Sequence, residues 1–197
     1  YKNLANTVSI LGVLPICFLF VKDGYHYLVP LIIYNNIMDD LDGILATKLN
    51  IKSRLGANLD NLCDAIAHTV FVMVVGVHFL GEDRSPGGFC AALSVVAAAA
   101  IVLRVATRLN PNAVAGIGSP TNELIRHIMF VLLLAQNFSS SPVPFLIAVF
   151  AIHAVSMLVP FGMPYQIRSL AKSPIAIIVV NMALVMAWLI PLATPVI

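Results

Sequence analysis

The sequence predicts an all-α fold, a polytopic membrane bundle of about six to seven transmembrane helices. Its 197 residues are 60% hydrophobic and only 10% charged, and the mean hydropathy of +0.96 lies far above that of a soluble domain. The apolar residues gather into runs of roughly 20, the length that a helix needs to cross the hydrocarbon core of a bilayer. Short loops with proline and glycine separate these runs, and no long linker divides the chain, so we expect one integral membrane domain over residues 1–197.

Seven apolar runs are candidates for the membrane-spanning helices. In order along the chain, they are residues 4–21, 27–46, 57–80, 89–108, 121–137, 143–161 and 174–194. The first run has the length of a signal peptide, but it contains Asn6 and Pro15 and ends without a small-residue cleavage site, so we count it as a span. The fifth run is short and carries Glu123 and Arg126, yet its remainder is continuously apolar and we retain it.

Basic residues gather on one side of the predicted membrane. If the N-terminus is cytoplasmic, the residues on that side are Lys2, Lys48, Lys52, Arg54, Arg104, Arg108, Arg168 and Lys172. Only Lys22 and Arg84 then face outward, so the positive-inside rule predicts a cytoplasmic N-terminus. The net charge of +2 comes from scattered loop residues and not from a basic run, and we therefore expect no nucleic acid as a partner.

Two pairs of aspartates lie inside neighbouring predicted spans. Asp39 and Asp42 are three residues apart and Asp60 and Asp64 four apart, and positions at these spacings share one face of a helix. A loop at 47–55 joins the two spans as a tight hairpin, which brings both pairs to the cytoplasmic face of the membrane. An intramembrane carboxylate is costly unless it is paired or bound to cations, and the same helices offer no nearby basic partner. We therefore predict a metal site, in preference to interhelical salt bridges, within an active site at the cytoplasmic face.

The spacing of these residues resembles a known signature. The string is Asp39-x-x-Asp42-Gly43-x-x-Ala46-Thr47-x8-Gly56-x3-Asp60-x3-Asp64. It is similar to the signature of the CDP-alcohol phosphotransferases and departs from it at Thr47, where that family has arginine and where the adjacent Lys48 is a candidate substitute. The resemblance implies a membrane-embedded, usually homodimeric enzyme. Such an enzyme transfers a substituted phosphoryl group from a CDP-linked donor to an alcohol and releases CMP.

The resemblance also implies roles for the individual residues. Asp39, Asp42 and Asp60 correspond to ligands of two divalent cations, Mg²⁺ or Mn²⁺, which prefer oxygen donors. Asp64 corresponds to the general base for the acceptor hydroxyl and to a further metal ligand. The nucleotide-binding residues that the motif predicts are Gly43, Ala46, Thr47 and Gly56. Small residues let a nucleotide approach the backbone, although close helix packing explains the two glycines equally well.

A second polar cluster lies at the ends of the next two predicted spans. The candidates for an acceptor or phosphate pocket are Arg104, Arg108, Glu123 and Arg126, with Arg168 farther along the chain. Both signs of charge in one cluster favour a zwitterionic acceptor such as serine. Residues 103–110 and 116–120 also resemble segments of the phosphatidylserine synthase branch, whereas the residues after Asp64 do not.

The resemblance thus implies a phospholipid-synthesising enzyme that moves a phosphatidyl group from CDP-diacylglycerol to a small alcohol. A donor of the CDP-choline or CDP-ethanolamine type would instead bring a lipid alcohol to the same metal site. Choline, inositol phosphate and glycerol phosphate are alternative acceptors. A non-catalytic relative or a cation transporter would also carry intramembrane aspartates, but a transporter predicts acids spread through the depth of the membrane.

Overall fold

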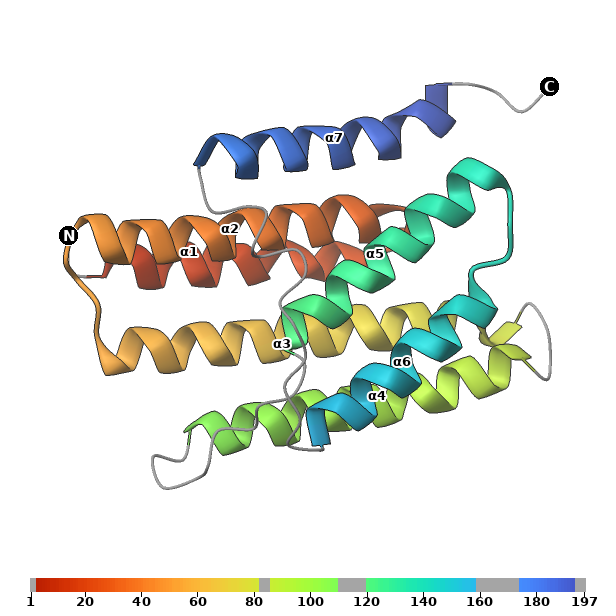
Figure 1. The fold of residues 1–197 in the computed structure, drawn as a ribbon, viewed down its shortest axis with the longest axis horizontal. Helices are drawn as coiled ribbons and strands as arrows, with labels where there is room; N and C mark the ends of the chain where they lie inside the picture. The colour runs from red at the N-terminus through yellow and green to blue at the C-terminus, as the bar shows by residue number, and fades with distance from the viewer. Residues whose placement is uncertain (1–2, 82–85, 110–119, 159–173, 194–197) are drawn as a thin grey trace.

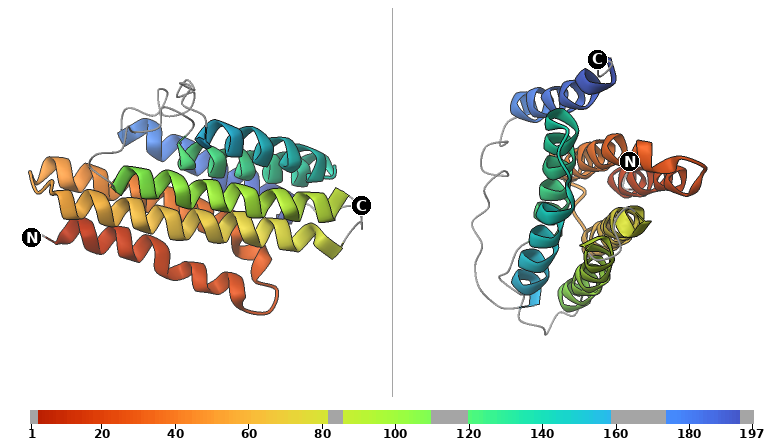
Figure 2. Two further views of the ribbon diagram at one scale, coloured as in Figure 1. Left: turned by 90° about the horizontal axis from the view of Figure 1, so that it is seen from below. Right: turned by 90° about the vertical axis from the view of Figure 1, so that its right-hand side faces the viewer.

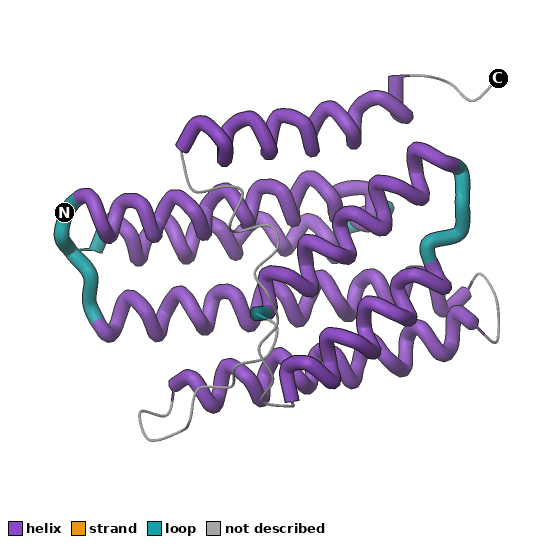
Figure 3. Tube along the Cα trace, in the orientation of Figure 1, coloured by secondary structure: helices purple, strands orange, loops and turns teal. Residues whose placement is uncertain are grey.

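The computed structural model describes residues 3–81, 86–109, 120–158 and 174–193. These residues form seven α-helices joined by short turns and 3₁₀ segments, with no strand among them (Figures 1 and 3). The helices are α1 Leu4–Val13, α2 Leu28–Lys48, α3 Arg54–His78, α4 Pro86–Leu109, α5 Thr121–Phe138, α6 Val143–Leu158 and α7 Pro174–Ala193. The predicted all-α fold is confirmed.

Six of the predicted apolar runs each correspond to one α-helix, whereas the first run, residues 4–21, contains both α1 and the 3₁₀ helix Leu14–Phe20. Several of the helices extend past the apolar residues. α2 continues to Lys48 and α3 begins at Arg54, so the predicted loop at 47–55 is shortened to residues 49–53. Ser53 accounts for the early start of α3, because its Oγ accepts a hydrogen bond from the Gly56 N–H at 3.0 Å. This bond satisfies one of the backbone donors that a helix start leaves free. Hydropathy marks the part of a helix that suits hydrocarbon, whereas the cap residue decides where the helix begins.

Three of the described helical segments are long and apolar enough to cross a membrane. They are Arg54–Gly81, Pro86–Leu109 and Ile175–Ala193. Leu4–Phe20 and Val143–Leu158 are apolar but shorter. These helices support the predicted membrane bundle, whose charged and amide side chains are concentrated in α2, in the first half of α3, at the end of α4 and at the start of α5.

The middle of the bundle is built on α3 and α4. α3 packs against α1 and α4, and α4 packs in turn against α6 (Figure 2). α3 comes very close to α4 at Gly76, where a Cβ atom would lie 1.9 Å from Ser94 Oγ. Small residues at such contacts let membrane helices approach and gain van der Waals contact. Large side chains fill the remaining core, and Phe71, Phe150 and Ile101 are among those that are fully buried.

α1 gives way to a 3₁₀ helix, Leu14–Phe20, at Pro15. Proline has no backbone N–H, so the carbonyl of Leu11, four residues earlier, loses its intrahelical donor. The Tyr34 hydroxyl on α2 donates a hydrogen bond to that carbonyl at 3.1 Å. A neighbouring helix thus satisfies the group that proline leaves free, as the hydrocarbon core requires. The contact ties α1 to the helix that carries the first aspartate pair.

α7 lies along the edge of the bundle, where it contacts α2 and α5 (Figures 1 and 2). Near the end of α5, Asn137 Nδ2 donates a hydrogen bond to the Ala187 carbonyl of α7 at 3.1 Å. Most of the apolar side chains of α7 are exposed, including Ile175 and Met182. The outer surface of this helix is therefore suited to contact with lipid.

Candidate active site

Three aspartates gather where the last turns of α2 face the first turns of α3. One carboxylate oxygen from each of Asp39, Asp42 and Asp60 lies within 4.8 Å of the other two. Carboxylates at this separation repel one another, and a divalent cation between them would remove the repulsion. Carboxylate oxygens are also the ligands that Mg²⁺ and Mn²⁺ prefer. The residues present therefore fit a divalent metal centre.

Asp64, the fourth aspartate of the motif, lies one turn farther along α3. Its side chain is 17% exposed, and its charge interacts with those of Asp39, Asp42 and Asp60 without belonging to their close group. His68 Nε2 lies 3.9 Å from Asp64 Oδ1. Asp64 therefore borders the aspartate cluster, and it is not among the residues that line the neighbouring cavity.

Two side chains from outside the α2–α3 hairpin hold the first two aspartates. Asn122 Nδ2, in the first turn of α5, donates a hydrogen bond to Asp39 Oδ2 at 3.0 Å. Ser9 Oγ of α1 donates a short hydrogen bond to Asp42 Oδ2. Sequence analysis missed both residues. The available signals were weak: Asn122 adjoins the polar start of its helix, and Ser9 is a single hydroxyl in an apolar run.

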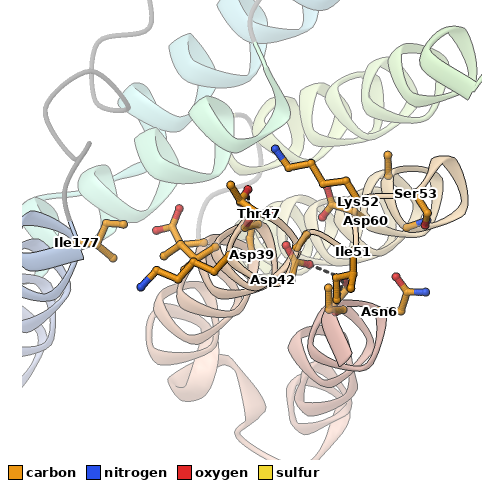
Figure 4. Close-up of a pocket in the computed structure, with 18 residues that line it drawn as sticks. Asn6, Asp39, Asp42, Thr47, Ile51, Lys52, Ser53, Asp60 and Ile177 are labelled. Atoms are coloured by element: carbon orange, nitrogen blue, oxygen red, sulfur yellow. Dashed lines mark hydrogen bonds between the residues drawn. The ribbon is translucent and has the colours of Figure 1, made fainter. Parts of the chain in front are cut away.

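A cavity of about 680 Å³ opens beside the aspartates (Figure 4). This volume falls within the roughly 300–1,000 Å³ that is typical of ligand pockets. The cavity wall includes all the residues that the motif predicts for the nucleotide, namely Gly43, Ala46, Thr47 and Gly56. Asp39, Asp42 and Asp60 line the same cavity. Asn6 of α1 and Ile177 of α7 line opposite sides of it (Figure 4). Residues of four helices thus line an open cavity that borders the candidate metal centre.

The two motif glycines, which the sequence alone left open between two interpretations, have different surroundings. A Cβ atom on Gly43 would meet no neighbouring atom within 4 Å, so helix packing does not require glycine there. A Cβ atom on Gly56 would lie 3.0 Å from Asn6 Oδ1 and 3.2 Å from Ser53 Oγ. The surroundings therefore leave space for a ligand at Gly43 and show close packing of α1 on α3 at Gly56.

The position where the family signature has arginine carries a short polar side chain. Thr47 Oγ1 donates a hydrogen bond to the Gly43 carbonyl of its own helix at 2.8 Å. Lys48 and Lys52 line the cavity together with Thr47. The cavity therefore has cationic side chains on the same stretch of chain, although none at the signature position.

The predicted acceptor cluster lies on α4 and α5. Arg126 Nη1 lies 3.3 Å from Glu123 Oε1, and the two side chains form a largely buried ion pair. Arg104 is buried within the bundle, whereas Arg108 is exposed in the last turn of α4. None of these four described side chains lines the cavity. The cluster is therefore separate from the predicted nucleotide site.

The charges of this cluster nevertheless act on the aspartates. Arg126 interacts electrostatically with Asp39, and Arg108 interacts with Asp64. Each of these arginines therefore partly offsets the negative charge of one aspartate. Arg168 and residues 116–119 lie outside the described residues.

A family model described as CDP-alcohol phosphatidyltransferase matches residues 2–192 of the chain. The match spans nearly all of the 197 residues, so it covers the aspartates, the cavity and the acceptor cluster together. A comparison with curated proteins gave no match. The family match agrees with the resemblance that the aspartate motif predicted.

Proposed function

Because the chain belongs to the CDP-alcohol phosphatidyltransferase family, whose members are phosphotransferases, we propose that it transfers the phosphatidyl group of CDP-diacylglycerol to serine. Family membership and the apolar helices together indicate an integral membrane enzyme of phospholipid synthesis. The observation that carries the proposal is the position of Asp39, Asp42 and Asp60 in the wall of a cavity of about 680 Å³. A diphosphate bound in that cavity would lie directly against a site suited to divalent cations.

In the proposed reaction, the aspartates hold the metal and Asp64 moves the proton. Asp39, Asp42 and Asp60 would hold two divalent cations, with Asp64 as a further ligand. Bound Mg²⁺ or Mn²⁺ would neutralise the donor diphosphate and stabilise charge on the attacking and leaving oxygens. Asp64 would accept the proton of the acceptor hydroxyl. The hydroxyl oxygen then bonds to the phosphatidyl phosphorus while the bond from that phosphorus to the CMP oxygen breaks, and CMP leaves.

The donor would lie with its nucleotide in the cavity and its acyl chains in the bilayer. Lys48 and Lys52 line the cavity and would attract the diphosphate in place of the arginine that the family has at position 47. Gly43 leaves open space where the nucleotide would approach. Ile177 gives the cavity an apolar border at α7, the helix whose outer surface suits lipid. We place this end of the bundle and the N-terminus on the cytoplasmic side, because Lys48, Lys52 and Arg54 lie at the α2–α3 turn.

The acceptor would bind on the α4–α5 side of the aspartates. Glu123 and Arg126 place a carboxylate and a guanidinium side by side. Such a pair can exchange its internal contact for the ammonium and carboxylate groups of serine. Arg104 and Arg108 add positive charge on α4, and the charge of Arg108 acts on Asp64. This arrangement supports a zwitterionic acceptor over a neutral alcohol.

The test is an assay of CMP release by the purified protein in lipid nanodiscs with Mg²⁺ or Mn²⁺. CDP-diacylglycerol would be combined in turn with serine, choline, glycerol phosphate and inositol phosphate. We expect release that depends on serine and is lost in Asp64→Asn. Release with another alcohol would correct the acceptor, and release only from CDP-choline or CDP-ethanolamine with diacylglycerol would correct the donor. If no donor and acceptor pair releases CMP and the protein instead carries divalent cations into proteoliposomes, the result would favour a transporter.

A further inference from the structure

The side-chain amide of Asn122 is held at both ends. Asn122 Oδ1 accepts a hydrogen bond from the Thr121 hydroxyl at 3.3 Å, and Asn122 Nδ2 donates to Asp39 Oδ2 at 3.0 Å. An ionised carboxylate only accepts hydrogen bonds, so the amide must turn its NH₂ group toward Asp39. Thr121 is buried, with 4% of its surface exposed. The orientation of Asn122 is therefore set by its own helix before any ligand binds.

Ser9 makes the equivalent contact with the second aspartate. Its hydroxyl lies close to both the Ala5 carbonyl, at 3.2 Å, and Asp42 Oδ2, which is nearer. A serine has one hydroxyl proton, and a charged carboxylate is the stronger acceptor, so the proton goes to Asp42. Both Ser9 and Asp42 are largely buried, and both line the cavity beside the aspartates.

We propose that Asn122 and Ser9 are positioning residues that orient Asp39 and Asp42 as metal ligands. A carboxylate has about four lone-pair positions, so one hydrogen bond fixes its rotation and leaves the others for a cation. Asn122 lies 83 residues from Asp39 in sequence and Ser9 lies 33 from Asp42. The metal centre formed by the α2–α3 hairpin is thus completed by α1 and α5. This inference rests on the metal centre of the proposed function.

The experiment measures Mn²⁺ binding directly, by electron paramagnetic resonance of free Mn²⁺ in titrations of detergent-purified protein. Removing an outer hydrogen bond to a metal ligand typically costs about 10- to 100-fold in metal affinity. Asn122→Ala and Asn122→Leu should therefore each raise the Mn²⁺ Kd at least about tenfold. The leucine variant keeps the branching at Cγ and leaves no cavity, which separates loss of the hydrogen bond from loss of packing. Ser9→Ala should act in the same direction.

Asn181→Ala is the matched control. Asn181 Nδ2 donates a hydrogen bond to the Ile177 carbonyl of its own helix at 2.8 Å, and this bond does not involve an aspartate. Its Mn²⁺ Kd should stay at the wild-type value. In CMP-release assays at fixed metal, the Asn122 variants should lower kcat and leave the acceptor KM unchanged. Melting temperatures within a few degrees of wild type would show that the variants fold.

The outcomes separate this inference from the proposed function. Wild-type Mn²⁺ affinity in folded Asn122→Leu would overturn the positioning role and leave the metal centre intact. Wild-type protein that binds no Mn²⁺ would overturn the metal centre, and the positioning role with it. If Asn122→Ala fails to fold, the Mn²⁺ affinities of Asn122→Leu and Ser9→Ala still test the positioning role.

Discussion

Replacing Gly43 by alanine tests whether the cavity beside the aspartates receives the donor nucleotide. A Cβ atom at this position would meet no protein atom within 4 Å, so the fold has room for the added methyl group. Alanine is also about 0.8–1.0 kcal/mol more favourable than glycine in a helix interior. Gly43→Ala should therefore leave the melting temperature unchanged or raise it.

The same methyl group would occupy space that the donor needs. Gly43 lines the cavity together with Asp39, Asp42 and Asp60. An extra methyl group in a fitted site typically costs about 1–3 kcal/mol. That cost corresponds to binding that is weaker by roughly fivefold to 150-fold. We expect the donor KM, and the Kd measured by competition with CDP, to rise within this range while the acceptor KM stays constant.

Gly76→Ala provides a matched comparison on α3. A Cβ atom there would lie 1.9 Å from Ser94 Oγ and 3.3 Å from the Ala91 Cα, so α3 and α4 must separate to admit it. Overpacking of this kind costs about 1–3 kcal/mol of stability. The melting temperature should fall, whereas donor binding by the protein that remains folded should not change.

A wild-type donor KM and CDP Kd in Gly43→Ala would refute the assignment of the cavity to the nucleotide.

Four further predictions concern the metal, the general base, the missing arginine and the acceptor. Asp60→Ala should abolish CMP release, as should excess chelator, because the remaining carboxylates lose their shared cation; full turnover in either case would contradict the metal-centre interpretation. Asp64→Asn should lower kcat far more than it weakens CDP binding, since it removes a base at the edge of the cluster. Thr47→Arg should raise kcat/KM for the donor, because position 47 faces the cavity; an unchanged value would show that the nearby lysines already suffice. Glu123→Gln and Arg104→Ala should each raise the acceptor KM at least about tenfold, a loss near 1.4 kcal/mol, with the donor KM unchanged; normal acceptor kinetics in both would mean that the cluster is structural.

The sequence alone was sufficient to predict the positions of most helices and the aspartate motif. Hydropathy is a property of consecutive residues, and so it located the helices from α2 to α7 to within a few positions. α1 ends at Val13, well before the predicted run ends at residue 21, because Pro15 interrupts the α-helical hydrogen bonds. The α2–α3 turn was predicted two residues too long at each end, because the Ser53 cap and not hydropathy sets the start of α3. Asp39, Asp42 and Asp60 could be placed together because helical periodicity and one short hairpin relate them. The distances among these three aspartates depend only on residues that are close in the chain.

Contacts between distant helices were not available from the sequence. The hydrogen bonds of Asn122 to Asp39 and of Ser9 to Asp42 join α5 and α1 to α2. The difference between Gly43, in open space, and Gly56, against Asn6, likewise depends on where α1 packs. Membrane helices are apolar on most faces, so their hydropathy does not say which face meets which neighbour. Close packing and a few buried hydrogen bonds decide that choice, and these exist only once the helices are assembled.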